Sequence, residues 1–176
     1  MKYYTFKVLL IGAPNVGKTS IFYRYVKNQF SQDYITTIGI NYLTKEITID
    51  SKKKIKLVIS DIAGQEKFKS LRKEFYQGAN GALVIFDLTQ LKTYKAVEGW
   101  LSEMFEILEE NIPFIITGNK VDLIEEINRS IDKDIVKDYA ESKNSIYIET
   151  SAKTGEKVEE AFEELALRMV KRASKK

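Results

Sequence analysis

The segment Gly12-Ala-Pro-Asn-Val-Gly-Lys-Thr19 limits more tightly than any other what this chain can fold into. It follows an apolar, β-rich segment, Thr5 to Ile11, and it leads into Lys18 to Lys27, where apolar residues recur at helical spacing. The pattern G-x-x-x-x-G-K-[ST] between a strand and a helix is typical of a loop that binds phosphate groups. Its glycines let the backbone approach the ligand, and successive N–H groups bind phosphate oxygens. We therefore predict a phosphate-binding loop after the first strand.

Two side chains of this loop have specific expected roles. Lys18 supplies a positive charge to the β and γ phosphates, and Thr19 offers its hydroxyl to Mg²⁺. The residues predicted to contact the nucleotide here are Asn15, Val16, Gly17, Lys18, Thr19 and Ser20.

Strand-like and helix-like segments alternate along the rest of the chain. Gly39 to Asp50 and Lys54 to Asp61 alternate apolar and polar residues around a turn, which predicts one antiparallel hairpin. Further strands are predicted at Gly81 to Leu88, Pro113 to Gly118 and Ser145 to Glu149, and helical faces at Val97 to Leu108, Ile131 to Tyr139 and Val158 to Met169. This order predicts an α/β fold, a mostly parallel sheet with core-forming helices on both faces.

The composition excludes several kinds of chemistry. The 176 residues fit one domain, 1–176, with a short basic tail at 171–176. There is no cysteine and no histidine, which rules out disulfides, cysteine nucleophiles, thioether lipid anchors and the commonest general base. The net charge of +3 gives no nucleic-acid footprint. Catalysis must therefore use carboxylates, amides, Lys, Thr or a bound cation.

The chain shows neither a signal peptide nor an apolar run of the roughly 18 residues that a spanning helix needs. We therefore expect a cytoplasmic protein, peripheral to membranes at most. The tail at 171–176 is interpreted as a solvated terminus, and weak attraction to anionic lipid is the alternative.

A second motif, Asn119-Lys-Val-Asp122, identifies the base. It follows a predicted strand and so stands at the carboxyl edge of the sheet, where ligands bind in this architecture. Asp122 can accept hydrogen bonds from both N1–H and N2–H₂ of guanine, and adenine has no such pair of donors. Lys120 can lay its stem along the base. Together with the phosphate loop, this motif predicts guanine-nucleotide binding.

A third motif, Asp61-Ile-Ala-Gly-Gln65, follows the predicted hairpin. Asp61 is placed to hold Mg²⁺ through water. Gly64 can turn its N–H toward a γ-phosphate, and Gln65 can orient the attacking water. We expect catalysis to rest on Gln65 and Gly64 together with Lys18.

Taken together, these motifs resemble the Ras superfamily of small GTPases over about residues 6–170. The resemblance implies a six-stranded G domain with one antiparallel edge strand and five helices. It implies that Thr37 coordinates Mg²⁺, senses the γ-phosphate and belongs to the catalytic set, and that Phe30 packs against guanine. The other nucleotide contacts that it implies are Tyr34, Ser151, Ala152 and Lys153. The metal set is then Thr19, Thr37 and Asp61.

Within the superfamily the chain most resembles the Rab group, in segments such as Glu66-Lys-Phe-Lys-Ser-Leu71 and Phe86-Asp-Leu-Thr89. It departs from that group in carrying Ser60 where a tryptophan is usual, and in lacking prenylation cysteines. Either membrane attachment is absent, or the tail was removed, or a partner supplies the anchor. The segment Pro14-Asn-Val-Gly-Lys18 resembles the loop of Era-like GTPases, which add an RNA-binding domain that does not fit in this length. A prenylation-free Rab-like chain suits an archaeal relative.

The resemblance implies a switch in trafficking or signalling. GTP and Mg²⁺ order switch I (about 30–39) and switch II (about 62–73), and hydrolysis releases them. Effector, exchange-factor and activating proteins bind through these segments, and no nucleic acid is involved. No arginine in cis is evident, so we expect intrinsic turnover on the order of 10⁻⁴ to 10⁻³ s⁻¹. A module that holds GTP as a structural ligand and a P-loop kinase are the alternatives.

Overall fold

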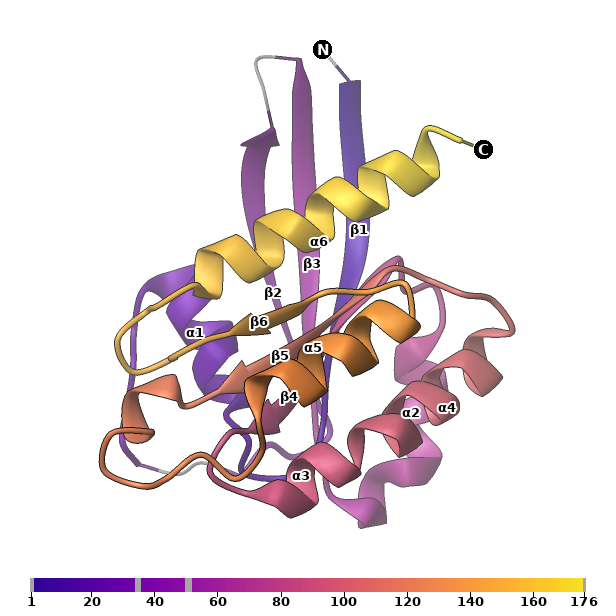
Figure 1. The fold of residues 1–176 in the computed structure, drawn as a ribbon. Helices are drawn as coiled ribbons and strands as arrows, with labels where there is room; N and C mark the ends of the chain where they lie inside the picture. Colours follow the sequence, from indigo (N-terminus) through magenta and orange to yellow (C-terminus); the bar gives the residue numbers. More distant parts are fainter. Residues whose placement is uncertain (1, 34–35, 50–51, 176) are drawn as a thin grey trace.

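A six-stranded sheet forms the centre of the molecule (Figure 1). The computed structural model describes residues 2–33, 36–49 and 52–175. The strands stand in the order β2-β3-β1-β4-β5-β6, and β2, at one edge, runs antiparallel to β3. Their bounds are β1 Lys2–Ile11, β2 Ile40–Ile49, β3 Lys53–Ile62, β4 Gly81–Asp87, β5 Phe114–Asn119 and β6 Tyr147–Glu149. The other neighbouring strands pair in parallel, which confirms the expected sheet.

Helices cover both faces of this sheet (Figure 1). Their bounds are α1 Lys18–Lys27, α2 Lys69–Tyr76, α3 Leu91–Lys95, α4 Val97–Leu108, α5 Lys133–Ser142 and α6 Val158–Ala173, with 3₁₀ turns η1 Glu66–Phe68 and η2 Val121–Leu123. Ala96, which separates α3 from α4, keeps a right-handed helical backbone. The pair therefore corresponds to one of the five helices that were expected.

The alternation of side chains along β1 shows how two cores arise from one strand. Val8 and Leu10 pack with α1 and α6, whereas Leu9 and Ile11 pack with the layer that contains α2, α4 and α5. All four side chains are buried. A strand covered on both faces must be apolar at every position, which explains the continuous run at this point of the sequence.

The helical face predicted from Ile131 to Tyr139 is wrong in one respect. The side chain of Ile135 is 57% exposed, while Val136 next to it is buried. Helix α5 begins only at Lys133, because the Asp132 carboxylate accepts a hydrogen bond of 2.8 Å from the N–H of Asp134 and caps the helix. Ile131 therefore precedes the helix, and Ile135 is turned toward solvent.

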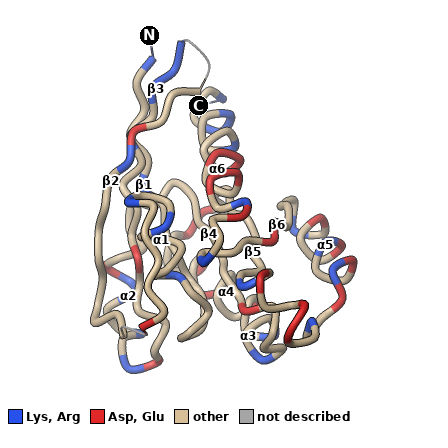
Figure 2. The backbone as a smooth tube through the Cα atoms, turned by 90° about the vertical axis from the view of Figure 1, so that its left-hand side faces the viewer, with Lys and Arg blue, Asp and Glu red and all other residues tan. Residues whose placement is uncertain are grey.

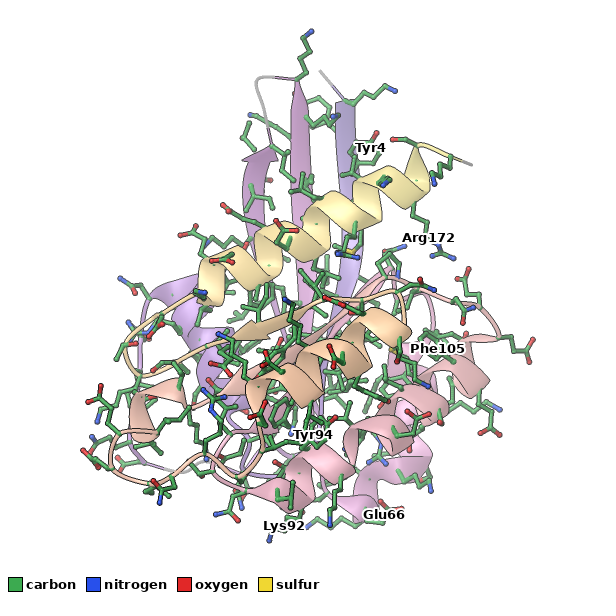
Figure 3. The ribbon with its side chains drawn as sticks, in the orientation of Figure 1. Tyr4, Glu66, Lys92, Tyr94, Phe105 and Arg172 are labelled. Atoms are coloured by element: carbon green, nitrogen blue, oxygen red, sulfur yellow. The ribbon has the colours of Figure 1, made fainter. Side chains whose placement is uncertain are left out.

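The two ends of the sheet differ. Figure 2 shows Lys and Arg gathered at one end of the molecule. At this end β1 and β3 begin and the last turn of α6 lies. In Figure 3, Tyr4 lies beside this end of α6, near Arg172, and Glu66 lies at the opposite end of the molecule. That opposite end carries the carboxyl ends of the parallel strands. In the part of the chain that is described, no helix is long and apolar enough to cross a membrane.

Candidate nucleotide-binding site

A cavity of about 600 Å³ opens at the carboxyl edge of the parallel strands. Its lining includes residues from the loops after β1, β3, β5 and β6, together with residues 29–33 and 36–37. The volume lies within the range of small-molecule sites. Because the loops belong to different strands, the fold is what brings the three sequence motifs to one place.

Most of the predicted site residues line this cavity. They are Asn15, Gly17, Lys18, Thr19, Ser20, Phe30, Thr37, Gly64, Gln65, Asn119, Lys120, Asp122, Ala152 and Lys153. Val16, Asp61 and Ser151 are fully buried behind the surface of the cavity. Tyr34 lies outside the described residues.

The phosphate loop is held in shape by Lys18. Its Nζ donates to the carbonyl oxygens of Gly12 at 2.9 Å and Ala13 at 2.7 Å. Burial lowers the pKa of Lys18 to about 8. A Cβ at Gly17, where φ is 96°, would lie 2.2 Å from Nδ2 of Asn119, so that position requires glycine. The first turn of α1 follows directly and offers unpaired N–H groups to an anion.

Three side-chain oxygen atoms meet next to this loop. Oγ1 of Thr19 donates to Oδ2 of Asp61 at 2.6 Å and lies 2.7 Å from Oγ1 of Thr37. Oγ1 of Thr37 is 3.3 Å from the same carboxylate oxygen. The other oxygen of Asp61, Oδ1, is buried without a hydrogen-bond partner. Burial raises the pKa of this carboxyl group, and the two threonines and Lys18 oppose the shift.

The chemistry of this cluster fits Mg²⁺. The ion prefers oxygen ligands and is usually bound by one or two carboxylates together with phosphate oxygens and water. Among the described residues, no group of three or more acidic side chains could hold a metal without such help. Asp61 and the two threonine hydroxyls match a site that is completed by a nucleotide.

Gly64 and Gln65 stand beside the lysine. A Cβ at Gly64 would lie 2.4 Å from the carbonyl oxygen of Gly12 and 2.8 Å from Nζ of Lys18, so only glycine fits so close to the phosphate loop. Gln65 also lines the cavity. Its carbonyl accepts a hydrogen bond of 3.1 Å from the N–H of Phe68, and Gln65 caps η1.

The opposite end of the cavity carries Asp122. Oγ of Ser151 donates to Oδ1 of this carboxylate at 2.6 Å. Phe30, which packs partly against the core, lines the same cavity. An ionised carboxylate in this position can accept two N–H donors of a base edge.

Asn119 connects three loops rather than pointing into open space. Its Nδ2 donates to the carbonyl oxygen of Val16 at 2.9 Å. Its Oδ1 accepts from Oγ1 of Thr150 at 3.1 Å and from the N–H of Ala152 at 3.3 Å. The side chain is 1% exposed, so it ties the phosphate loop to the ends of β5 and β6 and the loops that follow them.

The comparisons with known proteins agree with this geometry. A family model described as the Ras family matches residues 7–171. The chain belongs to the Ras family. It is 42% identical over 164 residues to the Ras-related protein RabJ of Dictyostelium discoideum, which covers 93% of this chain and 63% of RabJ.

Two further relatives carry Rab names. The chain is 39% identical over 173 residues to RABA1h of Arabidopsis thaliana, which covers 98% of this chain and 78% of RABA1h. It is 39% identical over 170 residues to Rab-21 of Homo sapiens, which covers 97% of this chain and 74% of Rab-21. These similarities make the chain a Rab-like small GTPase, and it spans 63% to 78% of the length of these relatives.

The structure of this Ras-family GTPase adds Asp87 to the site. Lys120 donates from Nζ to Oδ2 of Asp87 at 2.7 Å and to the carbonyl oxygen of Asn15 at 2.8 Å. Asp87 ends β4 and is 4% exposed, with Oδ1 accepting from Thr89. No role was predicted for Asp87 from the sequence, although its place at the carboxyl end of a buried strand was a usable signal.

Arg24 of this GTPase was also missed. From α1, its Nε donates to the carbonyl oxygen of Ala152 at 2.7 Å and its Nη2 donates to that of Lys153 at 2.6 Å. It therefore holds the loop after β6 against the end of the cavity that Asp122 lines. Nothing local in the sequence pairs a residue in a helix with a loop 128 positions away.

Proposed function

We propose that this Rab-like GTPase binds GTP and GDP with Mg²⁺ in the 600 Å³ cavity and acts as a slow molecular switch. The observation that carries the proposal is the lining itself. Lys18 and Thr19, Thr37 and Gln65, and Asp122 come from distant segments and share one cavity. Residues assigned to phosphate binding, to γ-phosphate sensing and to base recognition thus line the same cavity.

The hydrolytic reaction is an in-line attack of water on the γ-phosphorus, in which the protein contributes positioning and charge. The side chain of Gln65 orients the water. Lys18, held over the loop, neutralises charge that develops on the β and γ phosphates. The N–H of Gly64 and the N-terminal N–H groups of α1 add fixed donors.

Bound Mg²⁺ supplies charge neutralisation for the phosphate oxygens. Thr19 and Thr37 would hold the ion directly and Asp61 through water. Oδ1 of Asp61, buried without a partner, supports this assignment. Thr37 connects the ion site to switch I, so loss of the γ-phosphate releases that segment.

Partner proteins bind, in this proposal, where large apolar side chains of both switches and of the adjoining strand β2 are exposed. Ile38 is 80% exposed, Tyr42 on β2 is 49% exposed and Leu71 on α2 is 43% exposed. Tyr42 pairs across the sheet with the buried Ser60, the position at which Rab proteins usually carry a tryptophan. Effectors that distinguish the GTP form would read these side chains. Membrane trafficking or signalling is the process that the Rab-named relatives support.

For location we propose the cytoplasm, with weak peripheral attraction to anionic membranes. The basic end of the molecule, which is remote from the cavity, supports such an orientation (Figure 2). Because each exposed cation contributes only about 1 kcal/mol at an anionic surface, a partner would have to strengthen the contact.

The decisive experiment combines base competition with hydrolysis. Displacement of a fluorescent GDP is measured with GTP, XTP and ATP, and single-turnover hydrolysis is measured for the wild type and Gln65→Leu. We expect GTP and GDP to compete at least 1000-fold better than ATP, and the variant to bind normally but hydrolyse at least tenfold more slowly. Equal competition by ATP would reject the guanine assignment, and an unchanged rate would reject the role of Gln65.

Switching itself is tested by hydrogen exchange. The proposal expects residues 36–39 and 62–73 to exchange more slowly with a non-hydrolysable GTP analogue than with GDP. Residues of α6, far from the cavity, serve as the internal control. If both nucleotide forms exchange alike, the protein holds the nucleotide as a structural ligand instead.

A further inference from the structure

Arg72 of α2 is an unusual core residue. Its side chain is 1% exposed and is the largest of the fully buried side chains among the described residues. Removing a guanidinium from water is costly, and an apolar side chain of similar volume would often stabilise a protein as well or better. A buried arginine in switch II therefore calls for a function beyond packing.

Residues of helix α4 bind the guanidinium of Arg72. Its Nε donates to Oε1 of Glu103 at 2.7 Å and its Nη2 donates to Oε2 at 3.0 Å, which makes a bidentate ion pair. Its Cζ lies 4.7 Å from the centre of the Trp100 ring. The hydroxyl of Tyr76 donates to Oε1 of Glu103 at 3.1 Å. These contacts set the position of the arginine within narrow limits.

The remaining nitrogen of the guanidinium, Nη1, contacts the proposed catalytic segment. Nη1 of Arg72 donates to the carbonyl oxygen of Gln65 at 3.2 Å. This is the carbonyl that also accepts from Phe68 at the start of η1, so the arginine pins the residue at which switch II leaves the cavity. Glu66, 77% exposed at its side chain, lies 3.9 Å from Nη2 and adds only a weak contact.

We propose that Arg72 is a positioning residue for hydrolysis, which holds the backbone of Gln65 so that its side chain faces the attacking water. Helix α4, through Glu103 and Trp100, is the fixed frame for this contact. Because Arg72 is buried and fully engaged, it acts on the rate through Gln65 and does not reach the phosphates itself. The inference rests on the proposed function, in which Gln65 orients water.

The first test compares two matched arginine-to-lysine changes. Arg72→Lys keeps the charge but cannot contact both oxygens of Glu103 and the carbonyl of Gln65 together. Arg129→Lys disrupts another bidentate pair, the one with Glu149, away from switch II. Single-turnover GTP hydrolysis and GDP affinity are measured in the intact chain. We expect at least a fivefold slower rate for Arg72→Lys, with affinity within twofold, and no change of rate for Arg129→Lys.

A second variant separates positioning from stability. Arg72→Met with Glu103→Met replaces the ion pair by apolar side chains of similar size, which preserves packing. The inference expects near wild-type thermal stability but hydrolysis as slow as in Arg72→Lys. Hydrolysis at the wild-type rate in this stable double variant would overturn it. If the double variant hydrolyses GTP at the wild-type rate while Gln65→Leu still lowers the rate, only the role of Arg72 is rejected. If the wild type fails to bind guanine nucleotides, the proposed function itself is rejected.

Discussion

Ser151 donates a hydrogen bond of 2.6 Å to Oδ1 of Asp122, across 29 positions of sequence. This bond orients the carboxylate that we assign to base recognition and ties its loop to the loop after β6. A carboxylate fixed by a neutral donor keeps its other oxygen and remaining lone pairs for the base. Base selectivity in this protein should therefore depend on both residues, and chiefly on the charged one.

Asp122→Asn should change the preferred base. The amide presents a donor where guanine also presents a donor, whereas xanthine presents an oxygen there. We expect GTP affinity to fall by about 100-fold, or about 2.7 kcal/mol, and XTP to bind better than GTP. Competition with a fluorescent nucleotide measures both. As a control, Ser151→Ala keeps the carboxylate of Asp122 and should lose less GTP affinity than Asp122→Asn. Preference for GTP as strong as in the wild type would contradict the assignment of Asp122.

Arg24→Ala should speed nucleotide release. The arginine holds the carbonyl oxygens of Ala152 and Lys153, and without it the loop at the base end is anchored less firmly. Loss of these two charge-assisted bonds predicts about a tenfold faster release of GDP. Stopped-flow release of a fluorescent GDP measures the rate. Arg168→Ala, on α6 and outside the cavity, is the matched control and should release GDP at the wild-type rate.

Removal of Mg²⁺ should also speed nucleotide release, through the phosphate end of the site. We expect excess EDTA to accelerate GDP release at least tenfold, because the phosphates lose the ion that links them to Thr19 and Asp61. Thr37→Ala should leave GDP release nearly unchanged but weaken the GTP analogue, since Thr37 is assigned to the γ-phosphate side. Thr37→Ser, which keeps the hydroxyl, should behave like the wild type. Release that ignores EDTA would speak against the metal site.

Glu103 makes part of the stability depend on pH. Burial opposes ionisation of this carboxyl group, but the hydrogen bonds and charge of Arg72 prevail and hold its pKa below the ordinary value of 4.5. The pair therefore stabilises the folded state fully above pH 4.5 and is lost as the pH falls through the lowered pKa.

The variant Glu103→Gln isolates this contribution. At pH 7 the free energy of unfolding of this variant should be about 3 kcal/mol lower than that of the wild type, because the buried Arg72 loses its charged partner. The difference should shrink below pH 4.5, where the wild type also becomes neutral at this position. Urea unfolding between pH 7 and pH 3 measures it. A difference that stays constant over this range would show that the ion pair is not its source.

Trp100 offers a direct view of switch II. It is the one tryptophan in the sequence, and the guanidinium of Arg72 lies over its ring. If switch II rearranges with the nucleotide, Trp100 emission should differ between the GDP form and a non-hydrolysable GTP form. The difference should shrink in Arg72→Lys. Identical spectra in the two nucleotide forms of the wild type would place the rearrangement away from α4.

Much of the site was predictable because its signals are local. The glycine pattern at residues 12–19 and the positions of Asp61 and Asn119 at strand ends are properties of short segments. Parallel strands carry their carboxyl ends to one edge, so these segments had to meet. The contacts that complete the site join residues far apart in sequence, such as Arg24 with Ala152 and Lys120 with Asp87, and no local pattern pairs them.

The sequence by itself determined the strand–loop–helix order, the family and the three motifs, because periodicity and glycine placement act within a few residues. Only the tertiary structure decided which side chains hold those motifs in place. It turned Ile135 outward although its spacing suited a core, and it buried Arg72 although arginine is normally exposed. The reason is that burial depends on what packs opposite a residue, and for Arg72 the opposing residues, Trp100 and Glu103, lie on another helix.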